Sequence, residues 1–120
     1  MTTKTRLQKL ERQIDKMKQA LGSLGEMRPG SLSRQYNVCG KPGCRCKDKA
    51  EPRKHGPYYQ LSYVDAGRST SQFIKVEFVA QTRQQIENYR QFKRLTEAWS
   101  RLALRHAKLR IQIEKQAKKS

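Results

Sequence analysis

Two stretches of the chain carry apolar residues at helical spacing. In the first, gaps of three and four residues alternate between the apolar positions, which are Leu7, Leu10, Ile14, Met17, Leu21 and Leu24. This heptad spacing places a narrow apolar stripe along one face of a helix. Gly22, Gly25 and the pair Pro29–Gly30 then interrupt it. The sequence therefore predicts a helix over residues 4–24 that must pack against a partner.

The second stretch, residues 79–118, contains no proline or glycine and predicts one long helix. Its stripe again follows gaps of three and four residues. The members are Tyr89, Phe92, Leu95, Trp99, Leu102, His106, Leu109 and Ile113. Because His106 occupies an apolar position of the heptad, we interpret it as a packing residue and not as a ligand.

Residues 57–78 alternate between the two faces of a predicted β-hairpin with a turn at Asp65–Gly67. Tyr59, Leu61 and Tyr63 share one face, which can pack, and Gln60, Ser62 and Val64 share the other. The connector over residues 25–56 holds a polar segment, 31–36, that fits either a short helical turn or an extended lead-in.

The expected fold is a single α+β domain over residues 1–120, mostly α. Two antiparallel heptad helices, a short N-terminal one and a long C-terminal one, flank a small head formed by the cysteine loop and the hairpin. Because the last helix is about twice as long as the first, part of its stripe needs another partner. That partner is either a second copy of the chain, giving a coiled-coil homodimer, or a larger protein complex.

The chain is strongly basic, with 27 Lys and Arg against 10 Asp and Glu and a formal net charge of +17 over 120 residues. Such a surplus attracts polyanions and favours nucleic acid as the partner. No apolar run approaches the roughly 18 residues that a membrane-spanning helix needs. The helical stripes are also narrower than the apolar faces of interfacial helices, so no membrane partner is expected.

All three cysteines fall in the segment Cys39–Cys46, and His55 follows nine residues later. Cys39, Cys44, Cys46 and His55 supply the four sulfur and nitrogen ligands of a tetrahedral zinc site. The spacing of four residues and then one is unusual for zinc, which leaves free thiols or one disulfide as alternatives. An odd cysteine count and the absence of a signal peptide argue against secretion, so we expect a cytoplasmic protein.

The hypothesis that follows is a zinc-stabilised nucleic-acid-binding module in which the ion holds a basic loop against phosphates. The expected contacts are Arg28, Ser31, Arg34, Lys41, Arg45, Lys47, Arg53, Lys54, Tyr58, Arg90, Lys93 and Arg94. The alternative is an adaptor subunit that docks a larger nucleic-acid-processing complex through its helical stripe. The chain shows no catalytic triad, phosphate-binding glycine loop or carboxylate pair, and four ligands would fill a zinc shell, so no enzyme is expected.

The motifs Gly30–Leu32, Cys39–Cys46 (CGKPGCRC), His55–Tyr59 (HGPYY) and Asn88–Arg90 resemble a family of small basic prokaryotic proteins. The resemblance covers roughly residues 29–104. That family is a domain of unknown function, often linked to mobile elements. The resemblance therefore implies a prokaryotic origin and a mobile-element link, which favours DNA over RNA, and it names no activity.

Overall fold

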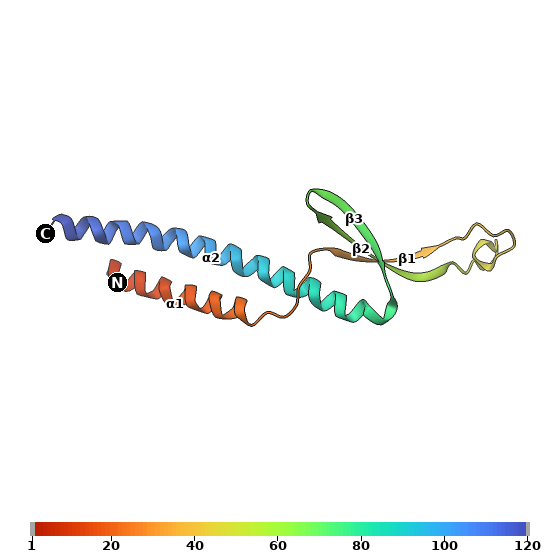
Figure 1. Ribbon diagram of the computed structural model, residues 1–120, viewed down its shortest axis with the longest axis horizontal. Helices are drawn as coiled ribbons and strands as arrows, with labels where there is room; N and C mark the ends of the chain where they lie inside the picture. Colours follow the sequence, from red (N-terminus) through yellow and green to blue (C-terminus); the bar gives the residue numbers. More distant parts are fainter. Residues whose placement is uncertain (1, 120) are drawn as a thin grey trace. The chain divides into compact units, whose positions relative to one another are not determined.

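The computed structural model describes residues 2–119. Figure 1 shows two helices, α1 (Thr3–Gly22) and α2 (Val79–Lys119), and three strands, β1 (Ser31–Asn37), β2 (His55–Asp65) and β3 (Arg68–Ile74). The class is α+β and mostly helical, as the sequence predicts. The chain divides into two compact units, and a single domain over residues 1–120 stays a prediction. One unit joins the chain up to Glu26 with the chain from Asn88 onward, and the other comprises Met27–Glu87.

In the helical unit, α1 begins at an N-cap in which the Thr5 N–H donates to the hydroxyl of Thr2 at 3.1 Å. Leu7 is buried, and the other apolar residues of its stripe are half-buried. The ammonium of Lys18 lies 5.5 Å from the centre of the Trp99 ring. The apolar stripe of α1 is thus shielded from solvent as its spacing predicts, while antiparallel pairing with α2 stays a prediction.

His106 lies on α2 in this helical unit, and its ring nitrogen is 3.2 Å from a carboxylate oxygen of Glu11. Arg110 reaches the same oxygen at 3.6 Å. The His106 side chain is half-buried, so it fits the packing role expected from its heptad position.

In the other unit the strands form one antiparallel sheet in the order β1–β2–β3. β2 and β3 make the expected hairpin, with Asp65 opposite Arg68 at the turn. β1 pairs along the other edge of β2, from Ser31 opposite Ser62 to Asn37 opposite His55, with a bulge between Gln35 and Asn37. The polar segment that the sequence left undecided is therefore the extended third strand.

One face of this sheet is covered and forms a small core. Leu61, in the central strand, is 1 % exposed, and the first turns of α2 bury Val79, Thr82 and Ile86. The guanidinium of Arg83 lies 5.9 Å from the centre of the Tyr59 ring. The sequence analysis assigned the stripe of α2 only from Tyr89 onward and missed this earlier section, because the polar Thr82 interrupts it.

The opposite face of the sheet is open. The amide of Gln35 donates to the side-chain oxygen of Gln60 across the β1–β2 pair at 2.7 Å. Ser62, Val64 and Phe73 are exposed on the same face, as the strand alternation predicts. A sheet with one packed and one open face leaves the open side chains free to contact a partner.

Candidate metal centre

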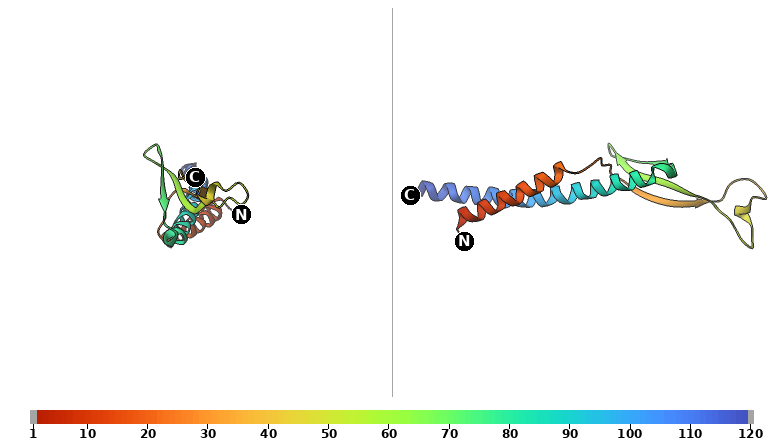
Figure 2. Two further views of the ribbon diagram at one scale, coloured as in Figure 1. Left: turned by 90° about the vertical axis from the view of Figure 1, so that its right-hand side faces the viewer. Right: turned by 90° about the horizontal axis from the view of Figure 1, so that it is seen from below.

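The four predicted metal ligands come from the loop that joins β1 to β2. Figures 1 and 2 show this loop at the end of the sheet away from the β2–β3 turn. Cys39 follows β1 by two residues, and His55 is the first residue of β2. Because Asn37 and His55 are paired in the sheet, the two ends of the loop are held next to one another.

A tight fold of the loop brings Cys44 and Cys46 back toward these anchors. Gly43 has a positive φ of 76°, which only glycine adopts without strain, and Cys44 then leads into the 3-10 turn Arg45–Lys47. The Lys47 N–H donates to the Cys44 carbonyl at 3.0 Å, and the Arg53 N–H donates to the Arg45 carbonyl at 2.9 Å. The turn chemistry of Lys41–Gly43 therefore closes the loop as the sequence predicts.

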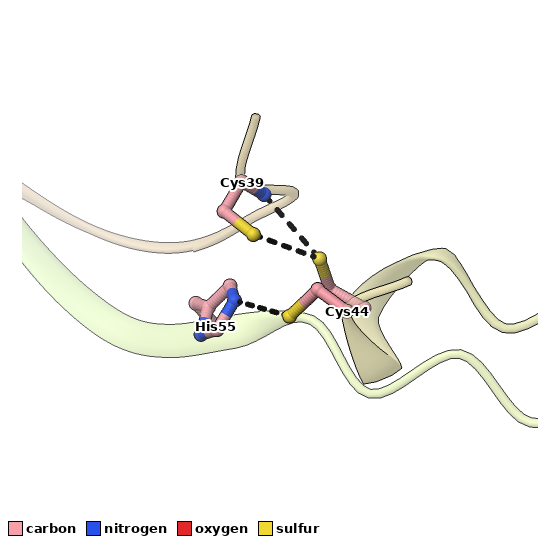
Figure 3. Close-up of side chains that lie close together, drawn as sticks. Cys39, Cys44 and His55 are labelled. Carbon is pink, nitrogen blue, oxygen red and sulfur yellow. Dashed lines mark hydrogen bonds between the residues drawn. The ribbon is translucent and has the colours of Figure 1, made fainter. Parts of the chain in front are cut away.

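All four ligand atoms lie within 4.8 Å of one another. The sulfurs of Cys39 and Cys46 are 3.6 Å apart, and the Cys44 sulfur is 3.2 Å from Nε2 of His55. Figure 3 shows the Cys39 and Cys44 side chains and the His55 ring pointing toward a common centre. The predicted ligand set is therefore brought together in spite of its unusual spacing, and no two of the three cysteines form a disulfide.

The separations suit a small tetrahedral ion. Zinc bonds of about 2.3 Å to sulfur and 2.0 Å to nitrogen place two sulfurs about 3.8 Å apart, and a sulfur and a nitrogen about 3.6 Å apart. The observed 3.6 Å and 3.2 Å are close to these values. The group could therefore hold one metal ion once its wider separations, which reach up to 4.8 Å, shorten by about 1 Å.

Local hydrogen bonds and burial shift the pKa values of two of the thiols in opposite directions. The backbone N–H of Cys46 is the largest cause that lowers the pKa of Cys44 to about 6, followed by the side chains of Cys39, Cys46 and His55. Burial raises the pKa of Cys46, partly offset by the hydrogen bond that it accepts from the Cys39 N–H at 3.3 Å. At neutral pH Cys44 thus favours the thiolate, the form that binds metals.

The loop around this cluster is strongly basic. Between Cys39 and His55 the chain has six exposed basic side chains and two exposed acidic ones, Asp48 and Glu51. The basic ones are Lys41, Arg45, Lys47, Lys49, Arg53 and Lys54. The Lys47 ammonium donates to the Lys41 carbonyl at 3.1 Å, which brings these two predicted contacts together.

The other predicted nucleic-acid contacts are spread over both units. Ser31 and Arg34 lie exposed on β1, and Arg34 lies 5.9 Å from the centre of the Tyr36 ring. Arg28 is half-buried, and its N–H donates to the Gln85 carbonyl at 3.2 Å. Arg90, Lys93 and Arg94 are exposed on the part of α2 that belongs to the helical unit.

A cavity of about 690 Å³ adjoins the metal ligands. Its walls are Asn37, Cys39, Lys41, Cys44, His55, Tyr58 and Phe73. The sequence analysis named five of these residues and missed Asn37 and Phe73. Phe73 could have been found, because in the hairpin register it lies opposite Gln60 and therefore on the same face as Tyr58.

The chain belongs to the family described as a domain of unknown function, DUF6788, whose family model matches residues 7–84. The match begins and ends earlier than the expected 29–104, so it includes most of α1, the whole sheet and the metal loop. No curated protein and no solved structure matches the chain. Among the described residues, no helix is both long enough and apolar enough to cross a membrane.

Proposed function

We propose that this protein is a zinc-stabilised nucleic-acid-binding module. The observation that carries the proposal is the placing of four zinc-type ligands within 4.8 Å of one another inside a loop with six exposed basic side chains. From Cys39 to Lys54 only Cys46 is buried. A loop with so little core needs the ion to keep its shape.

The bound zinc would have a structural role and the loop an electrostatic one. With Cys39, Cys44, Cys46 and His55 as ligands, the ion has no open position for a substrate, so the proposed role is binding without a catalysed reaction. Lys41, Arg45 and Lys54 and their neighbours would then face phosphates from a fixed backbone. We favour DNA over RNA, and an accessory role in a mobile element or nuclease machinery, on the family resemblance.

The helices would contribute further basic side chains and mediate assembly. We propose that α1 and α2 pair antiparallel along their heptad stripes, which would account for the Glu11–His106 and Lys18–Trp99 contacts. Leu104 and Ile111 on α2 are 59 % and 53 % exposed. These two side chains support homodimerisation, and they also favour the second candidate function, an adaptor that docks a larger complex.

The test combines metal content with salt-titrated binding by the full-length protein. We expect about one zinc per chain, binding to random-sequence DNA that weakens steeply with salt, and loss of both zinc and binding in Cys44→Ser. Metal-free protein, or zinc-loaded protein that binds neither DNA nor RNA, would contradict the proposal. Absence of nucleic-acid binding together with co-purification of a protein partner would support the adaptor.

A further inference from the structure

Two aromatic side chains stand exposed on the open face of the sheet, beside the metal loop. Tyr58 is 42 % exposed and Phe73 is 67 % exposed. Their rings pack edge to face, with 6.5 Å between centroids and 67° between planes. Apolar rings left in solvent by the free protein are typical of a binding surface, because contact with a partner removes them from water.

The same two rings line the 690 Å³ cavity together with three of the metal ligands and with two further polar residues, Asn37 and Lys41. Asn37 brings an amide, which can both donate and accept hydrogen bonds, and Lys41 brings a positive charge. Cavities with aromatic walls and a few polar groups are the usual form of a binding site for a flat organic group. A lysine in the wall of the same cavity favours a flat group that carries an anion.

The surrounding face of the sheet carries almost no charge. Ser33, Gln35, Gln60 and Ser62 share it through the paired registers of the strands. Such a face cannot hold phosphates by charge, whereas the adjoining loop can. The surface thus separates an uncharged aromatic part from a cationic part, and nucleic acid separates its bases from its phosphates in the same way.

We infer that Tyr58 and Phe73, with Asn37 at the base edge and Lys41 at the phosphate, form a site for an unstacked base of single-stranded nucleic acid. This inference rests on the proposed function and deepens it, since it names the form of nucleic acid that the module prefers. Bases in a duplex are stacked on one another, so they cannot present a free face to the two rings. Aromatic residues on the open face of a sheet are a general means of stacking single-stranded bases.

The experiment uses full-length, zinc-loaded protein and two fluorescent probes of equal charge. One probe is a strand of 20 thymidines, and the other is a 20-residue abasic strand with the same phosphate backbone. At one salt concentration we expect the thymidine strand to bind about tenfold tighter or more, because only it can stack. Tyr58→Ala and Phe73→Ala should each remove most of this difference while leaving the salt dependence unchanged.

The control is Phe78→Ala, which removes an exposed phenylalanine of the same unit that does not line the cavity. It should keep the full preference for thymidine, and Tyr58→Trp should restore the preference that Tyr58→Ala loses. Zinc content of each variant verifies that His55, three residues from Tyr58, still binds the ion.

Equal affinity for the two strands in the unmodified protein, with steep salt dependence, would overturn the base site and leave the proposed function standing. An unchanged preference in both alanine variants would also overturn it. Failure to bind either strand would overturn the base site, and the proposed function would fall with it only if duplex DNA and RNA were not bound either.

Discussion

The two histidines of the chain occupy different surroundings, which makes them a matched pair for testing the metal site. His55 faces the Cys44 sulfur at 3.2 Å, whereas His106 faces the Glu11 carboxylate at the same distance. Loss of a residue that only hydrogen-bonds to a metal ligand commonly lowers the metal affinity by about 10–100-fold. Loss of a direct ligand should lower it more. We therefore expect His55→Ala to lower zinc affinity by more than about 100-fold, measured by competition with a chromogenic chelator.

His106→Ala is the control for this change, and it should retain one zinc per chain with unaltered affinity. Its loss of stability should be small, because the His106–Glu11 contact that it removes is partly exposed to solvent. Equal zinc affinity in the two variants would exclude His55 as a ligand.

Gly56 follows the metal ligand His55 in β2, at a point where β1 and β2 approach one another closely. Its φ is +136°, and a Cβ at this position would stand 2.8 Å from the carbonyl oxygen of Gln35. An alanine combines an unfavourable backbone angle with a backbone clash, so Gly56→Ala should lower the free energy of unfolding by about 1–3 kcal/mol. Urea denaturation of the zinc-loaded protein measures this change.

Gly40 provides the comparison for this prediction. It lies in the metal loop that precedes β2, and a Cβ there would meet nothing within 4 Å. Gly40→Ala should change the free energy of unfolding by less than about 0.5 kcal/mol. If both alanine variants behaved alike, the close approach of the two strands at Gly56 would be wrong.

At the scale of elements, the central strand β2 places alternate side chains on the packed and the open faces of the sheet. Leu61 is 1 % exposed toward the core, and Val64 on the same strand is 64 % exposed toward solvent. Leu61→Ala should cost about 2–5 kcal/mol, because it removes buried methyl groups and leaves a cavity. For a domain of this size each kcal/mol lowers the melting temperature by about 4–8 °C, so calorimetry should show a large shift.

Val64→Ala is the matched truncation on the open face of the same strand, and its melting temperature should stay within a few degrees of the unmodified protein. A comparable loss in both variants would mean that Val64 is buried as well and that the open face has been wrongly assigned.

The sequence predicted those elements whose pattern is local. Heptad spacing identified both helices, and two-residue alternation identified the β2–β3 hairpin together with its packed face. β1 was left undecided because its residues, SLSRQYN, are mostly polar and gain their strand conformation from pairing with β2, far along the chain. A pattern within one segment cannot show a partner that lies elsewhere.

The candidate site was predictable to the same extent. Four ligands could be counted from the sequence, and turn residues between Cys39 and Cys44 explained how the loop closes. Phe73 could be placed from the predicted hairpin, whereas Asn37 could not, since it reaches the cavity only through the pairing of β1 with β2. Residues that share a site through sheet register are visible once the register is known.

At the scale of the whole molecule, the question is whether its net charge of +17 acts as a diffuse attraction or through a defined surface. Two variants with equal charge separate these cases. One neutralises Lys41, Arg45, Lys47 and Lys54 to glutamine in the metal loop, and the other neutralises Lys108, Lys115, Lys118 and Lys119 near the end of α2. Each lowers the formal charge by four.

Each phosphate contact adds about 0.9 to the slope of log affinity against log salt on duplex DNA, and somewhat less on a single strand. If the metal loop holds the phosphates, its variant should lose about 3–4 in slope, while the α2 variant should keep the original slope. Anisotropy titrations on the same labelled DNA between about 50 and 200 mM NaCl cover a suitable range. Equal losses of slope would show that the charge acts diffusely, because a defined surface cannot respond alike to changes inside and outside it.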